Sequence, residues 1–143
     1  MTRLSLPSQA PDLGAREHAA KPRRSWHAKF RDAFRGIKLG IRGHSSFFVH
    51  FFFAALVVAA AIVLRCELVD WCLLMGCIGI VLTAELFNSA LETIFHQLDE
   101  RTRSRGFAAL DIAAGAVLMA SLTAIVIGAV VFLHRLAALL YAG

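Results

Sequence analysis

Charged residues are missing from two long stretches of this chain. No Asp, Glu, Lys or Arg occurs between Arg42 and Arg65, or between Asp111 and Arg135. As a helix rising 1.5 Å per residue, each stretch is long enough to cross a hydrocarbon core of ~30 Å. A hydrophobic content of 58% over 143 residues also exceeds that of a soluble domain. The sequence therefore predicts an all-α integral membrane protein.

Several common site patterns are also missing. The three cysteines form no Cys-x-x-Cys pair and have no adjacent His ligand, so we interpret Cys66, Cys72 and Cys77 as packing residues. The chain has no Walker A loop, no Gly-rich kinase loop and no H-R-D motif, which excludes both common soluble kinase classes. A cleavable signal peptide is not expected, because the first apolar run begins near Phe47 and is longer than a signal h-region.

The middle apolar segment carries acidic residues. Its uncharged run, 71–84, is too short to span a membrane and must continue through Glu85, Asn88 and Glu92 to reach Phe95. We therefore predict three spans, at about 47–64, 72–95 and 107–133. The second of them contains two carboxylates.

The segment before the first span predicts an amphipathic helix over residues 25–43. Apolar residues recur at steps of three and four, and charged residues fill the opposite face; the apolar set is Trp26, Phe30, Ala33, Phe34, Ile37 and Ile41. A basic polar face beside an aromatic apolar face suits the membrane interface, and docking on a soluble partner is the alternative. Residues 1–24 have no periodicity and predict a disordered basic tail.

Positive charge is distributed unevenly along the chain. Residues 1–46 contain ten Lys or Arg against three acidic residues, and Arg101, Arg103 and Arg105 follow the second span, whereas only Arg65 follows the first. By the positive-inside rule, this places the N-terminus in the cytoplasm and the C-terminus outside. The membrane explains the basic charge better than nucleic acid does.

Glu85, Asn88 and Glu92 lie on one face of the second span, at positions i, i+3 and i+7 over ~10.5 Å of helical rise. Ionisable residues are costly in a bilayer and usually serve a function. The structural alternative is that Glu92 reaches the interface and Glu85 is a protonated packing residue. Because one subunit offers few partners for Glu85, Glu92 and Asp111, we expect a homo-oligomer.

The chemistry that these residues suggest is phosphoryl transfer. Asp111 lies at the cytoplasmic end of the third span, next to a predicted basic loop at 99–105. In such reactions carboxylates hold Mg²⁺, basic groups hold nucleotide phosphates, and one carboxylate deprotonates the acceptor hydroxyl. His44, His50 and His96 are scattered, and we interpret them as polar contacts rather than as a transition-metal site.

Segment 84–92, Ala-Glu-Leu-Phe-Asn-Ser-Ala-Leu-Glu, is similar to the E-x-x-N-[ST]-A-[IL]-E signature of prokaryotic diacylglycerol and undecaprenol kinases. Segment 111–118 resembles their second signature, and the resemblance covers about 30–132. It implies a homotrimer in the inner membrane of a bacterium, with active sites on the cytoplasmic side. There Mg·ATP would phosphorylate the hydroxyl of diacylglycerol or undecaprenol, feeding phospholipid or isoprenoid-lipid recycling.

The resemblance also implies roles for individual residues. Glu85 would accept the proton, Asn88 would order the site, and Glu92 would bind metal and nucleotide. Asp111 would lie against the nucleotide, and the loop containing Arg101 and Arg103 would cover the phosphates.

Three positions differ from the family pattern. Leu110 replaces a lysine expected to contact ATP, His44 takes the place of an acidic metal ligand, and His96 replaces an aspartate. Two other functions therefore stay open: a catalytically silent member that binds lipid or nucleotide, and a small transporter that couples protons through Glu85.

Overall fold

The computed structural model describes residues 25–43 and 46–141. Within these ranges the chain forms four helices and no strand: α1 (Trp26–Gly43), α2 (Ser46–Val63), α3 (Leu68–His96) and α4 (Glu100–Tyr141). The predicted tail at 1–24 and the candidate metal ligand His44 lie outside the described residues.

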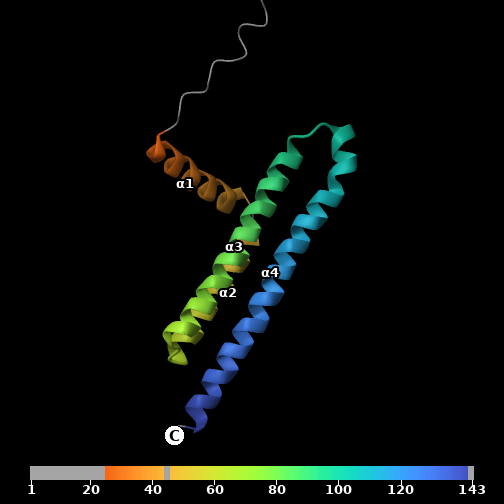
Figure 1. Cartoon of the computed structure of the whole chain (residues 1–143). Coiled ribbons are helices and arrows are strands. Elements are labelled where there is room, and N and C mark those ends of the chain that lie inside the picture. Colours follow the sequence, from red (N-terminus) through yellow and green to blue (C-terminus); the bar gives the residue numbers. More distant parts are fainter. Residues whose placement is uncertain (1–24, 44–45, 142–143) are drawn as a thin grey trace, which may run out of the picture.

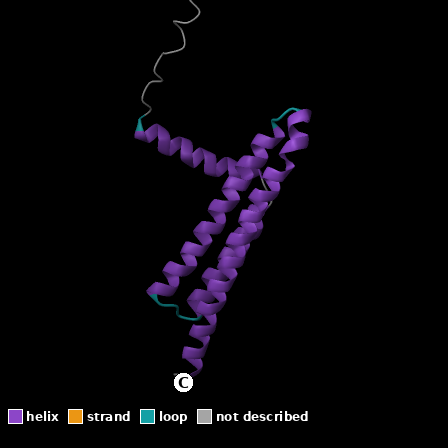
Figure 2. Cartoon of the chain, turned by 45° about the vertical axis from the view of Figure 1, so that its right-hand side comes forward, coloured by secondary structure: helices purple, strands orange, loops and turns teal. Residues whose placement is uncertain are grey.

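Three of the helices form an antiparallel bundle. α4 packs along much of α3, α2 packs against α3, and α2 meets α4 only sparsely, while α1 leaves the bundle at an angle (Figure 1). The α2–α3 and α3–α4 connections lie at opposite ends of the bundle (Figure 2). Helices α2, α3 and α4 are each long and apolar enough to cross a membrane. The predicted all-α membrane fold with a preceding amphipathic helix is thus confirmed.

Two helices are longer than predicted. α3 begins at Leu68 instead of 72, and α4 runs from Glu100 to Tyr141 instead of from 107 to 133. The prediction of a loop over 99–105 is wrong, because this segment is helical from Glu100 onward. Arginine is a good helix former, and an acidic residue in the first turn complements the helix dipole. The Arg103 amide, 2.9 Å from the Asp99 carbonyl oxygen, begins the hydrogen bonding of this helix.

The turn between α2 and α3 depends on Arg65. Its φ of 50° lies in the left-handed region. The Cys66 amide donates to the Ala61 carbonyl at 3.0 Å, and the Arg65 amide donates to the Ile62 carbonyl at 3.1 Å. This pair of bonds is the Schellman motif, which usually has glycine at the left-handed position. The motif explains why α2 ends at Val63.

The bundle end next to this turn is held by a core and an ionic cluster. Ala61, Leu74 and Val131, one from each spanning helix, form the buried core. On the same end, the Arg135 guanidinium of α4 donates to Glu67 at 2.8 Å and also to Asp70 in the first turn of α3. The hydrogen bond from Arg135 to Glu67, together with the positive charge of Arg135, lowers the pKa of the Glu67 carboxyl. The cluster fastens the last turns of α4 to the start of α3.

Helix α1 crosses α3 at Gly40. A Cβ atom at this position would lie 2.7 Å from Cδ2 of Leu86, so the backbone of α1 approaches α3 closely there. The large apolar residues that precede the crossing, among them Trp26, Phe30 and Phe34, are exposed. An apolar face left exposed beside three spanning helices is what a helix at a membrane interface requires.

Candidate active site

Glu85 of α3 is almost fully buried, at 2% exposure. It lies inside a candidate membrane span, where an unpaired carboxylate is costly. Its carboxylate is held by two side chains of α2. The Ser46 hydroxyl donates a hydrogen bond to Oε1, and Nε2 of His50 lies 3.7 Å from Oε2. Ser46 and His50 are one helical turn apart, so the first turn of α2 covers both carboxylate oxygens.

Asn88 and Glu92 form a second group on the same helix, further toward the α3–α4 connection. Nδ2 of Asn88 donates to Oε1 of Glu92 at 2.8 Å. Two buried oxygen atoms nearby, Oδ1 of Asn88 and Oγ of Ser89, have no hydrogen-bond partner within the described part of the chain. Buried polar atoms without partners are rare and call for a ligand or water. This face of α3 therefore has unused hydrogen-bonding capacity beside a carboxylate.

The donor set fits magnesium better than a transition metal. Mg²⁺ prefers oxygen ligands and is commonly held by one or two carboxylates together with substrate phosphates and waters. The Glu92 carboxylate and Oδ1 of Asn88 are oxygen ligands of this kind. Among the residues described, no group of three or more His, Cys, Asp or Glu side chains is placed to hold a metal ion.

Arg103 packs over the end of α3. Its Nη2 donates to the carbonyl oxygens of His96, at 2.9 Å, and Leu98, at 3.3 Å, and its guanidinium lies over the ring of Phe95. The first contact satisfies the carbonyl of His96, the last residue of α3, which the end of the helix leaves without an intrahelical partner. The buried Nε has no partner in the described ranges. Arg103 thus has a structural role that the sequence did not suggest, and one donor that remains available.

The remaining predicted site residues lie on α4. Arg101 belongs to the first turn of this helix, and Asp111 follows on an exposed position beside the half-buried Leu110. From Arg103 to Asp111 the helix rises ~12 Å. The structure therefore brings Glu85, Asn88 and Glu92 together on α3, as predicted from their spacing, and places Asp111 on the neighbouring helix.

Sequence reasoning missed Ser46 altogether and assigned His50 no role at Glu85. Both are separated from Glu85 by most of two helices, and only the register of α2 against α3 brings them together. The single available signal was their i, i+4 spacing, which puts two polar side chains on one face at the start of an otherwise apolar helix.

Comparison with known proteins shows the family of the chain. A family model described as prokaryotic diacylglycerol kinase matches residues 31–132. The chain belongs to the prokaryotic diacylglycerol kinase family. The matched range includes the site residues described above, namely Ser46, His50, Glu85, Asn88, Glu92 and Asp111.

Two curated relatives cover most of the chain. A diacylglycerol kinase of Synechocystis sp. is 28% identical over an alignment that covers 91% of this chain and 82% of that protein. An undecaprenol kinase of Bacillus subtilis (strain 168) is 29% identical over 107 residues, spanning 75% of this chain and 87% of that protein. No solved structure matches the chain.

Proposed function

We propose that this protein is a lipid kinase that transfers the γ-phosphoryl group of ATP to the hydroxyl of diacylglycerol or undecaprenol. Membership of the family, and relatives named for these two substrates, support the reaction class. The structural observation that carries the proposal is the buried carboxylate of Glu85, held by Ser46 and His50 beside the oxygen ligands of Asn88 and Glu92.

Glu85 is the general base of the proposed reaction. The lipid hydroxyl oxygen attacks the γ-phosphorus, its proton passes to the Glu85 carboxylate, and the bond from the γ-phosphorus to the ADP oxygen breaks. An ionised carboxylate in a membrane helix needs partners that stabilise its charge. The Ser46 hydroxyl and the His50 imidazole serve as these partners and fix the orientation of Glu85.

Glu92 and Oδ1 of Asn88 would hold Mg²⁺ together with the nucleotide, and His44 would add a ligand from the segment that follows α1. When bound, the ion neutralises charge on the phosphates. The Nδ2 donor of Asn88 orients the Glu92 carboxylate. Arg101, the available Nε of Arg103, and Asp111 would lie on the nucleotide side of the site.

We further propose that the protein is a homotrimer in a bacterial inner membrane, with a cytoplasmic N-terminus. The distribution of Lys and Arg supports this orientation. Large apolar side chains are exposed along all three spanning helices, which leaves surface for both lipid and neighbouring subunits.

The test is transfer of radiolabelled γ-phosphate from Mg·ATP to diacylglycerol and to undecaprenol by purified protein in mixed micelles. Glu85→Gln should abolish transfer while the oligomer stays intact. Glu67→Gln makes the same exchange at the opposite end of the bundle and should retain full activity. If the wild type binds nucleotide or lipid but transfers no phosphate to either acceptor, the chain is a silent member of the family and the proposal is wrong.

A further inference from the structure

Each turnover of the proposed reaction leaves a proton on Glu85. The carboxylate takes this proton from the acceptor hydroxyl and must lose it again before it can act as a base in the next turnover. Because Glu85 is almost fully buried, very little of its surface is open to solvent. The cycle therefore requires a neighbouring group that can accept the proton from Glu85.

Two side chains contact the Glu85 carboxylate, and only one of them can take up a proton. The Ser46 hydroxyl donates to Oε1, and a hydroxyl does not become charged near neutral pH. Nε2 of His50 lies 3.7 Å from Oε2, and imidazole is the side chain that gains and loses a proton between pH 5 and 8. The His50 side chain is 20% exposed and that of Glu85 only 3%. A proton that reaches His50 is therefore closer to water.

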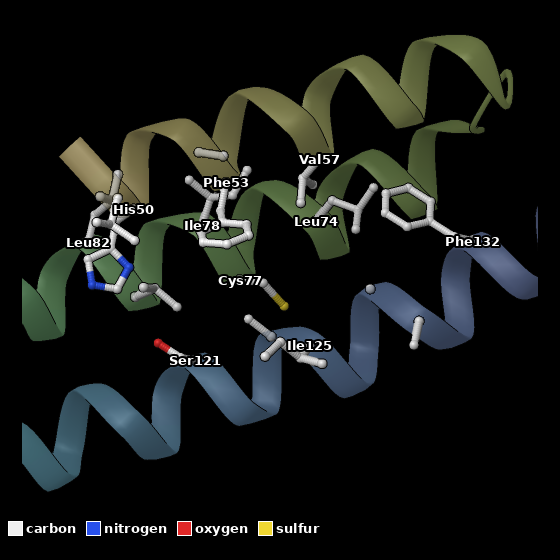
Figure 3. Close-up of a pocket in the computed structure, with 16 residues that line it drawn as sticks. His50, Phe53, Val57, Leu74, Cys77, Ile78, Leu82, Ser121, Ile125 and Phe132 are labelled. Atoms are coloured by element: carbon white, nitrogen blue, oxygen red, sulfur yellow. The ribbon is translucent and has the colours of Figure 1, made fainter. Parts of the chain in front are cut away.

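The surroundings of His50 contain no competing charge. Its imidazole lies at one end of an apolar cavity of about 420 Å³ between α2, α3 and α4 (Figure 3). In the described part of the chain, no Asp, Glu, Lys or Arg lines this cavity. The lining includes the Cys77 thiol of α3, more than two helical turns from Glu85, and α4 contributes the Ser121 hydroxyl. Glu85 is thus the one carboxylate, among the residues described, that pairs with His50.

We propose that His50 is the proton acceptor of Glu85. The neutral imidazole, with its hydrogen on Nδ1, presents the lone pair of Nε2 to Oε2. The O–H bond of the Glu85 carboxyl breaks as an N–H bond forms at Nε2, which leaves a carboxylate beside an imidazolium. The imidazolium then releases its proton to water, and both groups return to their starting state. The inference rests on the proposed lipid kinase function, which supplies the proton.

The distance between His50 and Glu85 is compatible with this transfer. A gap of 3.7 Å exceeds an N···O hydrogen bond of ~2.7–3.2 Å, so the two groups must approach by about 0.5 Å or be bridged by one water. Catalytic hydrogen bonds are often long in the absence of substrate and shorten in the complex. Ser46, one turn before His50 on α2, keeps the start of this helix against Glu85 through its own bond to Oε1.

His50→Ala provides the test, because the space it leaves joins the cavity and can admit free imidazole. In phosphate transfer to diacylglycerol or undecaprenol, kcat should fall about 100-fold, the lower end of what a positioned acid or base contributes. KM for ATP should not change. Added imidazole should restore most of the lost rate, and more so as the pH rises, because only the free base accepts a proton. His134→Ala is the matched control: this exposed histidine of α4 lies at the opposite end of the bundle, and its variant should keep the wild-type kcat with or without imidazole.

His50→Gln is a second variant, which keeps a polar side chain at this position and tests the same step if the alanine variant does not assemble. In the wild type, protonation of either Glu85 or His50 stops the cycle, so kcat should fall at low pH with the slope of two coupled protons. In His50→Gln only Glu85 titrates, so the slope should correspond to one proton and kcat should be lower at every pH.

Three results would overturn the inference. They are a wild-type kcat in either variant, a loss in assembled His50→Ala that imidazole does not restore, and an unchanged slope in His50→Gln. Each of them would leave His50 with a structural role only, while the wild type remains an active kinase. No transfer by the wild type overturns the proposed function instead.

Discussion

The Ser46 hydroxyl donates a hydrogen bond to the Glu85 carboxylate across 39 positions of the sequence. This contact joins the first residue of α2 to the buried acid of α3, and His50 adds to it one turn later. The first spanning helix is therefore part of the candidate site as well as of the bundle. Its position decides how the proposed base is presented to a lipid hydroxyl.

Ser46→Ala should lower kcat roughly 10- to 100-fold, because a hydrogen bond to a charged group contributes ~1.5–3 kcal/mol and tenfold in rate corresponds to about 1.4 kcal/mol. KM for ATP should not change, since Ser46 contacts Glu85 rather than the Asn88–Glu92 pair. The measurement is phosphate transfer at saturating lipid and ATP. Thr83→Ala is the control, because its hydroxyl donates at 2.7 Å to the Gly79 carbonyl of its own helix. A wild-type rate in Ser46→Ala would exclude a role in holding the base.

The site could be predicted from sequence only where its residues share one helix. The spacing of Glu85, Asn88 and Glu92 defines a common face, since helical geometry fixes the positions of residues a few places apart. The Ser46–Glu85 contact depends on the register of α2 against α3, which a single sequence does not contain. The basic segment at 99–105 is predicted as a loop because it lies between the predicted second and third spans, but a connecting position does not prevent a helix that begins at an acidic residue.

Gly36 and Gly40 should respond differently to alanine, although both lie inside α1. Glycine in a helix interior costs ~1 kcal/mol relative to alanine. A Cβ at Gly36 meets nothing within 4 Å, whereas at Gly40 it would lie 2.7 Å from Cδ2 of Leu86. Gly36→Ala should therefore slow hydrogen exchange of the α1 amides. Gly40→Ala should not slow this exchange, because the added Cβ would clash with Leu86. It should also lower activity, because Leu86 is the neighbour of Glu85 in the sequence and must shift. Equal protection and full activity in both variants would argue against a close crossing of α1 and α3.

Arg65→Gly should stabilise the protein by up to about 1 kcal/mol. A left-handed backbone costs a residue with a Cβ roughly 1–2 kcal/mol in the folded state. Glycine also makes the unfolded chain more flexible, which offsets about 0.4–1 kcal/mol of the gain from removing that cost. The measurement is equilibrium unfolding in detergent, followed by circular dichroism. Arg65→Ala removes the guanidinium but keeps the cost of the left-handed backbone, so it should show no comparable gain. Stabilisation by alanine as large as by glycine would mean that the charge, rather than the backbone, is unfavourable.

The Arg135 cluster predicts a stability that depends on pH. The hydrogen bond from Arg135, and its charge, hold the pKa of the Glu67 carboxyl below its ordinary value. A carboxyl whose pKa is lower in the folded state stabilises that state at pH values above its unfolded pKa of ~4.3, and this contribution is lost as the pH falls through the folded pKa.

Arg135→Gln should therefore lower Tm near neutral pH, and the difference from the wild type should narrow as the pH is reduced below about 4. Thermal unfolding in detergent between pH 7 and pH 3 measures both effects. Glu67→Gln is the matched control, because it leaves the contact between Arg135 and Asp70 in place. The Tm difference between this variant and the wild type should therefore change less steeply with pH. A Tm difference that stays constant down to pH 3 would show that the ionic contact with Glu67 does not contribute to holding α4 against α3.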